Sequence, residues 1–166
     1  MIVAGHVAAM KRRFEELGKH VDAIFVDGGG PGGGVIDILR RSGHDVFEVQ
    51  FGGSPNKSKI YKYKTDEIWG DMREAMSKLC LPGEKSEVGS ELRDQLTQRE
   101  YGFTVKDQLI QLESKKDMKA RQINSPDIAD ALALTFAQDI EKSQFAPGST
   151  TGGSRLETLH EYDPLA

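Results

Sequence analysis

The sequence predicts an α/β fold whose sheet is mostly parallel and flanked by helices. Apolar residues recur at helical spacing over residues 1–17, and the segment VDAIFVD (21–27) then has the β-branched and aromatic composition of a buried strand. A compact helical segment (34–43) and a second strand-like segment, DVFEVQF (45–51), follow at once. Such a close alternation of helix and strand is typical of a parallel α/β sheet.

The first two expected helices each end at a glycine. In the first helix, Gly18 follows an apolar stripe that we expect to face inward: Val3, Val7, Met10, Phe14 and Leu17. In the second helix, Gly43 follows Arg41 and Ser42, and the inward residues are Val35, Ile36 and Leu39. A glycine tract over residues 28–34 joins the first strand to this second helix.

The second half of the chain predicts three further helices and one strand. Thr65 is the expected N-cap of the next helix, whose apolar stripe is Ile68, Met72, Met76 and Leu79. Ser90 is the expected N-cap of a short helix that carries Leu92 and Leu96. The alternation in QLIQLES (108–114) predicts a strand, and residues 125–140 predict a clear helix with Ser125 at its N-cap.

Composition and charge describe one ordinary globular domain. The chain has 166 residues, 37% of them hydrophobic and 29% charged, which is enough for a single buried core. We expect a domain over residues 1–144 and a flexible tail over 145–166, where the sequence APGSTTGGS begins a polar, glycine-rich composition. The net charge of -4 excludes a strongly basic nucleic-acid binder but not a local basic face. The single cysteine, Cys80, excludes an internal disulfide, and we expect it to fill a small space in the core.

No apolar run reaches membrane-spanning length, and the first residues lack a signal-peptide pattern. We therefore expect a cytoplasmic protein with no membrane partner.

The glycine tract admits two interpretations, of which the first is a dinucleotide site. Gly28, Gly30 and Gly33 fit the G-x-G-x-x-G pattern, and Glu48 lies about twenty residues on, as that fingerprint requires. However, Asp27 would place a carboxylate against the pyrophosphate, and Glu48 lies inside its strand rather than at the strand end. A Walker phosphate loop is excluded, because no Gly-Lys-Ser/Thr closes the tract.

The second interpretation makes Asp27 a metal ligand. Asp27 ends an expected parallel strand, at the edge where α/β sheets collect their sites. Asp127 and Asp130 lie one turn apart on the last helix, and Asp130 stands in a nearly apolar run where an unpaired carboxylate is costly. The alternatives are a helix-dipole role for Asp127 and a solvent-facing surface for both. A metal accounts for all three acids, and oxygen ligands suit Mg²⁺ or Mn²⁺.

Several segments, in this order, make the chain resemble the C-terminal nuclease domain of the large subunit of tailed-phage terminases. They are VDAIFVDGGGPGGGVIDILRRSGHDVFEVQFGG, DEIWGDMREAM, YGFTVKDQLIQLESKKDMKARQINSPDIADALALTFA and HEYDPLA. The resemblance implies an RNase H-like fold that cleaves concatemeric double-stranded DNA during genome packaging. In that chemistry two Mg²⁺ or Mn²⁺ ions, about 4 Å apart, activate water and stabilise the leaving oxygen.

The resemblance also implies roles for individual residues and partners. Asp27 and Asp130 would be metal ligands, with Asp127 as a ligand or a neighbour of one. A basic segment would contact DNA phosphates through Lys115, Lys116, Lys119 and Arg121. The terminase small subunit and the portal protein are implied partners, in the cytoplasm of a bacterial host that carries the phage or prophage.

One departure from the family pattern weakens the expected activity. The family places a first aspartate on opening strands, and an ATPase domain further upstream, and the sequence given contains neither. We therefore expect a fragment or a truncated reading frame with impaired cleavage, and a free strand edge that favours self-association. The alternatives are a non-catalytic terminase remnant that acts as a DNA- or portal-binding assembly module, and the dinucleotide-binding domain.

Overall fold

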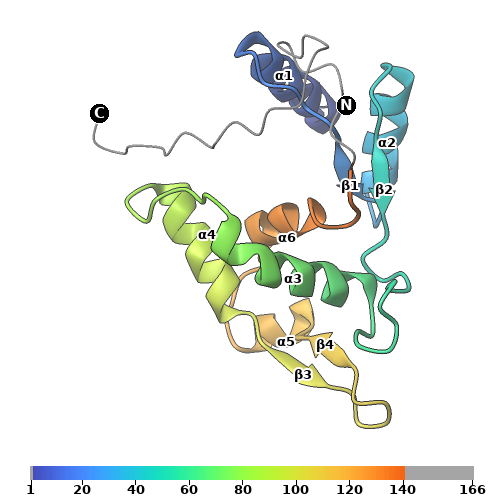
Figure 1. Cartoon of the computed structure of the whole chain (residues 1–166), viewed down its shortest axis with the longest axis vertical. Helices are drawn as coiled ribbons and strands as arrows, with labels where there is room; N and C mark the ends of the chain where they lie inside the picture. Colours follow the sequence, from blue (N-terminus) through green and yellow to red (C-terminus); the bar gives the residue numbers. More distant parts are fainter. Residues whose placement is uncertain (1, 141–166) are drawn as a thin grey trace, which may run out of the picture.

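The computed structural model describes residues 2–140, which form a mixed α/β domain (Figure 1). In chain order, its elements are α1 (Ile2–Glu16), β1 (Phe25–Asp27), α2 (Gly32–Arg41), β2 (Phe47–Val49), α3 (Lys64–Ala75), the 3₁₀ turn η1 (Met76–Lys78), α4 (Glu87–Gln98), β3 (Tyr101–Phe103), β4 (Ile110–Leu112), α5 (Lys115–Ala120) and α6 (Asp127–Leu134). The expected tail at 145–166 lies outside the described residues.

The parallel pairing predicted for the first half is confirmed. β1 and β2 form a two-stranded parallel sheet in which Phe25 pairs with Phe47 and Asp27 with Val49. The two phenylalanine rings stack with their centroids 5.4 Å apart. The strand predicted over 108–114 is also present, as β4, but it pairs antiparallel with β3, which the sequence did not predict.

The buried residues form two clusters on either side of the parallel sheet. The smaller cluster joins α1, α2 and the start of β2 through Ala4, Ile36, Leu39 and Val46. The larger cluster joins β2, α3, α4 and α6 through Val49, Ile68, Trp69, Met72, Leu92, Ala129, Ala133 and Ala137. α6 lies in the middle of the larger cluster and packs against α3, α4 and β1 (Figure 1).

The predicted helix α1 is confirmed, but the expected burial of its apolar stripe is wrong. Val3, Met10 and Leu17 are 58%, 55% and 64% exposed, and Ala4 is the helix's one fully buried residue. Among the described elements α1 packs mainly on α2, and a single neighbour covers only a narrow side of a helix. No helix in the described part of the chain is long and apolar enough to span a bilayer.

Three helices begin after a different N-cap residue than the sequence predicts. α3 begins after Tyr63 instead of Thr65, because the amides of Lys64 and Thr65 are already satisfied by the carbonyls of Gly53 and Phe51. α4 is capped by Ser86, whose hydroxyl accepts a hydrogen bond from the Gly89 amide at 3.1 Å.

The third cap is at α6, which begins after Pro126 instead of Ser125 and ends at Leu134, well before residue 140. Cys80 is exposed, so the expectation that it fills the core is wrong.

Candidate active site

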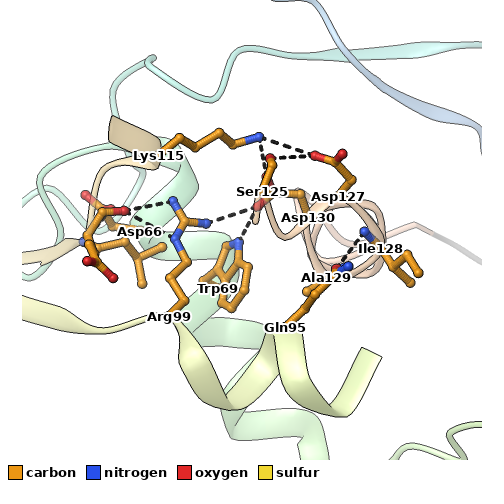
Figure 2. Close-up of polar contacts among 12 residues, drawn as sticks. Asp66, Trp69, Gln95, Arg99, Lys115, Ser125, Asp127, Ile128, Ala129 and Asp130 are labelled. Carbon is orange, nitrogen blue, oxygen red and sulfur yellow. Dashed lines mark hydrogen bonds and ion pairs between the residues drawn. The ribbon is translucent and has the colours of Figure 1, made fainter. Parts of the chain in front are cut away.

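Asp130 is the most constrained acidic side chain of the predicted set. It lies in the first turn of α6 with its side chain 8% exposed (Figure 2). The indole Nε1 of Trp69, on α3, donates to Asp130 Oδ1 at 2.9 Å. The guanidinium Nη1 of Arg99, at the C-terminal end of α4, donates to the same oxygen at 3.0 Å. Two donors from separate helices therefore fix one oxygen of this carboxylate.

Arg99 also contacts Glu113 and Trp69. Its Nε and Nη2 donate to the Glu113 carbonyl at 3.3 Å, and its guanidinium lies over the Trp69 ring at 4.8 Å. Burial lowers the pKa of Arg99, and the nearby carboxylates of Asp130 and Asp66 oppose that shift. Arg99 remains a cation at neutral pH, because a guanidinium is not deprotonated in proteins. The buried negative charge of Asp130 is thus paired with a buried positive charge.

The second oxygen of Asp130 is differently placed. Oδ2 is buried without a hydrogen bond of acceptable geometry among the described residues, although the Lys115 ammonium lies 2.8 Å away as an ion pair. Lys115 is 53% exposed and comes from the start of α5. The partner of this buried carboxylate oxygen is therefore an exposed side chain from another element.

Asp127 lies one helical turn from Asp130 but has a different environment. Its side chain is 79% exposed, and Ser125 Oγ donates to Asp127 Oδ1 at 2.6 Å. Lys115 Nζ is 3.9 Å from the same oxygen (Figure 2). The structure therefore brings Asp127, Asp130 and Lys115 together, with Asp127 on the solvent side.

Asp27 is at the carboxyl end of β1 and faces the layer that contains α6. Its Oδ1 accepts a hydrogen bond from the Gly29 amide at 3.1 Å, which is an Asx turn. Alternate strand residues point to one face, so Asp27 shares its face with Phe25, which packs on the core cluster that includes α6. α6 also contacts β1 directly. Asp27 and α6 thus lie on one side of the sheet.

Two glycines beside Asp27, Gly28 and Gly32, leave room for protein atoms, whereas Gly30, Gly33 and Gly34 have open space at the Cβ position. A Cβ on Gly32 would overlap the carbonyl oxygen of Asp27, so α2 can begin directly against the end of β1 only with glycine there. A Cβ on Gly28 would overlap the side chains of Glu48 and Gln50. This local packing explains the tract at these two positions without a pyrophosphate, and it places the Glu48 carboxylate beside the loop.

The basic residues divide into two groups. Lys115, Lys116 and Lys119 are exposed on α5. Arg121 is instead committed to the protein: it donates to Glu113 Oε2 at 2.6 Å, to Glu100 Oε1 at 2.7 Å and to the Gln98 carbonyl at 2.8 Å. Its hydrogen bond lowers the pKa of Glu113 and raises that of Arg121. Lys116 and Lys119 are thus exposed without an acidic partner among the described residues, whereas Lys115 pairs with Asp130 and Arg121, although also exposed, pairs with Glu113 and Glu100.

The acidic residues do not form a complete metal cage by themselves. Within residues 2–140 no group of three or more His, Cys, Asp or Glu side chains is arranged to hold a metal ion. Asp130 fits a metal by its buried, incompletely bonded Oδ2, and Asp27 fits by its place at a strand end. Asp127 and Asp130 lie together beside Lys115, and no hydrogen bond or ion pair among the described residues joins Asp27 to either of them.

Sequence reasoning missed Trp69 and Arg99, the two donors to Asp130. Their separation from Asp130, 61 and 31 residues, leaves no local pattern to detect. The one available signal was Asp130 itself, because a carboxylate in an apolar helical run requires buried donors from elsewhere in the chain.

Solved structures identify the architecture. The nuclease domain of the large terminase subunit of bacterial virus Sf6 superposes with a TM-score of 0.60 over 79% of this chain and 70% of that chain, at 18% identity. The chain has the fold of a phage terminase nuclease domain. A point mutant of that domain, solved with manganese, gives a TM-score of 0.59 at 19% identity over 78% of this chain and 70% of its own. The same mutant domain solved with calcium gives 0.58 at 19% identity, over 78% and 69%.

The predicted RNase H-like class, a small parallel sheet flanked by helices, is confirmed by these likenesses. No protein-family model matches the chain, and no curated protein matches it.

Proposed function

We propose that this chain is the nuclease part of a phage or prophage terminase large subunit, which cleaves concatemeric double-stranded DNA with divalent cations during packaging. The observation that carries the proposal is the environment of Asp130: a buried carboxylate with one oxygen fixed by Trp69 and Arg99 and the other paired with the Lys115 ammonium at 2.8 Å. A buried carboxylate oxygen that faces only an exposed ammonium is compatible with a cation ligand. The fold shared with terminase nuclease domains supports the same reading.

In this proposal Asp27 and Asp130 hold the cation from two sides. Asp130 supplies Oδ2 from α6, and Asp27 supplies a carboxylate from the end of β1, on the same side of the sheet. Asp127 borders the site as a solvent-exposed ligand or water-holding neighbour. A bound Mg²⁺ or Mn²⁺ supplies activation of water and stabilisation of charge on the phosphodiester. Lys115, Lys116 and Lys119 offer positive charge to the DNA backbone beside it.

We propose that the residues described here cleave DNA weakly by themselves. A two-ion site needs more carboxylate oxygens than Asp27 and Asp130 provide, and no third acidic side chain completes the group within residues 2–140. Plasmid nicking in Mn²⁺ is therefore expected to be slow. Robust nicking that Asp27→Ala abolishes would contradict the impairment while supporting the nuclease itself.

Metal binding tests the site independently of turnover. Calorimetry should detect Mn²⁺ binding to the chain, and Asp27→Asn and Asp130→Asn should each weaken it by about tenfold or more, because each removes a charged ligand. Asp127→Asn is the matched control from the same helical turn and should change affinity by only about two- or threefold. Equal affinities for the chain, Asp27→Asn and Asp130→Asn would refute the proposed site.

A second candidate function is a non-catalytic module that binds DNA or the portal. It is favoured by the Lys115–Asp130 ion pair, because the Lys115 ammonium already lies 2.8 Å from Asp130 Oδ2. This candidate predicts DNA binding without any Mn²⁺ binding, so the same calorimetry distinguishes the two.

Partners follow from the terminase assignment and from one exposed surface. We propose double-stranded DNA, the small terminase subunit and the portal protein as partners, in the host bacterial cytoplasm. Self-association is also proposed, because among residues 2–140 β1 pairs with β2 on one edge only, and because Val3 and Met10 of α1 and the following Leu17 are exposed. Light scattering at high concentration should detect dimers, and a strictly monomeric chain would argue against that surface.

A further inference from the structure

We propose that the cavity between α3 and the β3–β4 hairpin binds the chain's own C-terminal segment, residues 155–166. The cavity has a volume of about 550 Å³, within the range of roughly 300–1,000 Å³ that is usual for ligand sites. The hairpin lies below α3 in Figure 1, and Trp69 and Arg99 line the cavity whereas Asp130 does not. Most of the wall is apolar: Met72, Met76, Leu96, Tyr101, Ile110 and Leu112.

The two buried charged residues that line the cavity are already bonded within the protein. Asp66 accepts hydrogen bonds from the amides of Tyr63 and Leu112, at 2.8 and 2.9 Å. Arg99 is paired with Asp130 at 3.0 Å. A ligand gains little from groups whose hydrogen bonds are already made, so burial of apolar surface must supply most of its affinity.

Arg73, at the edge of this cavity, is a charged group that a ligand can still use. Lys57 and Arg99, the other cations that line the cavity among the described residues, are each paired with a carboxylate, whereas Arg73 has no acidic partner within residues 2–140. Its guanidinium lies 5.8 Å from the centroid of the Tyr101 ring, which is 54% exposed. Ile60 also lines the cavity and is 48% exposed. A fitting ligand therefore carries apolar side chains next to an acid.

The segment RLETLHEYDPLA has this chemistry. Leu156, Leu159 and Tyr162 recur every three residues, and Glu161 and Asp163 lie on either side of the tyrosine. The leucines and the tyrosine ring match the apolar wall, and the two acids match the unpaired guanidinium.

The segment is also within reach of the cavity. The described residues end at Ile140, which lines a neighbouring hollow that shares Lys57 and Glu74 with the cavity. The intervening residues, 141–154, can span up to about 45 Å when extended. A tethered segment acts at an effective concentration in roughly the millimolar range, which favours docking within one chain over docking between two chains.

The test uses the full chain, with its own segment prevented from docking by substitution. The triple variant Leu156→Glu, Leu159→Glu, Tyr162→Glu replaces the apolar side chains by charges. A fluorescein-labelled peptide of the unsubstituted residues 155–166 is titrated against this variant and against the parent, and anisotropy reports binding. The peptide should bind the parent at least about tenfold more weakly, because the parent's own segment competes for the cavity. The emission of Trp69, the protein's only tryptophan, should change in the same titration.

Two further substitutions, each added to the triple variant, show whether the peptide occupies this cavity. Arg73→Glu should weaken peptide binding about fivefold or more, because it places like charge against Glu161 and Asp163. Tyr101→Ala should weaken binding by a similar factor, because it removes an aromatic contact. The matched control is Lys106→Glu, a charge reversal on the same hairpin at an exposed residue that does not line the cavity, and it should stay within twofold. All three positions are exposed, and circular dichroism checks that each variant folds.

Binding to the triple variant that both Arg73→Glu and Tyr101→Ala weaken, and Lys106→Glu does not, supports the proposal. Absence of binding at millimolar peptide, or an affinity that neither cavity substitution changes, would overturn it. Equal affinities for the parent and the triple variant would show that the chain's own segment does not occupy the cavity. A parent that is dimeric by light scattering, with a monomeric triple variant, would assign the cavity to the segment of a second copy and overturn docking within one chain.

Discussion

The two sides of the candidate site are built differently. At the first turn of α6, Asp130 is buried and its Oδ1 is held by Trp69 and Arg99 from two other helices. At the end of β1, Asp27 is held only by a local turn to the Gly29 amide, beside a glycine tract. The Asp130 carboxylate is therefore held by contacts between distant segments, whereas the position of the Asp27 carboxylate depends on local backbone packing.

The largest expected effect separates the two aspartates of α6. Asp130→Ala should lower the free energy of unfolding by about 3 kcal/mol or more, because it leaves the Arg99 cation buried without its carboxylate. Asp127→Ala should cost under about 1 kcal/mol, since an exposed acid in a first helical turn contributes only that much. Urea unfolding of both variants measures this. Similar losses for the two would show that the buried pair does not stabilise α6.

The next effect tests the strand side through two neighbouring glycines. Gly32→Ala should destabilise the chain by about 2 kcal/mol or more, because its Cβ overlaps the Asp27 carbonyl and forces α2 away from β1. Gly33→Ala is the matched control: nothing lies within 4 Å of its Cβ position, so it should be neutral or stabilise by about 0.5 kcal/mol. Thermal unfolding of the pair decides. A harmless Gly32→Ala would mean that the tract is open space rather than a packing contact.

A pH experiment tests a second buried carboxylate, Glu67, in the first turn of α3. Burial would raise the pKa of Glu67, but hydrogen bonds from the Lys64 ammonium at 2.6 Å and the Lys57 amide at 2.6 Å hold it below its ordinary value of 4.5. A lowered folded pKa contributes stability that is fully present above about pH 4.5 and is lost as pH falls through the folded value.

Glu67→Gln should therefore be less stable than the parent by about 1–2 kcal/mol at pH 7. The difference should shrink below pH 4.5, as followed by urea unfolding at a series of pH values. A difference that is constant down to pH 3 would assign the loss to packing instead of charge.

The smallest expected effect concerns the exposed lysines of α5. Lys116→Ala and Lys119→Ala should each weaken DNA binding a few-fold and reduce the salt dependence of the binding constant by about one phosphate contact. Arg121→Met should not change the salt dependence, since its guanidinium is committed to Glu113 and Glu100. Fluorescence anisotropy over a range of salt concentrations checks this. A loss confined to Arg121→Met would reverse the assignment of the basic face.

Most helices and strands could be predicted from the sequence, but the contacts that cover each of them could not. Periodicity and strand composition located β1, β2, α2 and α6, because those patterns are local. The start of α3 moved from Thr65 to Tyr63, where the backbone carbonyls of Gly53 and Phe51 replaced a hydroxyl cap. The exposure of the α1 stripe was not predictable, because periodicity shows that a face is apolar but not what covers it.

In the candidate site, too, local positions could be predicted from the sequence and tertiary contacts could not. Asp27, Asp127 and Asp130 were chosen from strand-end and helix-turn positions, which are local features. Their unequal burial, and the partners Trp69 and Arg99, depend on contacts between distant segments. Local spacing therefore selected the acids as candidates, and only the tertiary structure separated the buried Asp130 from the exposed Asp127.

The central claim, that Asp27 and Asp130 serve one cation, is tested most directly by a double-mutant cycle in Mn²⁺ affinity. Calorimetry would compare the parent chain, Asp27→Asn, Asp130→Asn and the double variant. If both carboxylates hold the same ion, the double variant should bind Mn²⁺ no more weakly than the weaker single variant, because the first substitution already disrupts the site. Independent losses that add in free energy, or single variants that bind as tightly as the parent, would contradict a shared site.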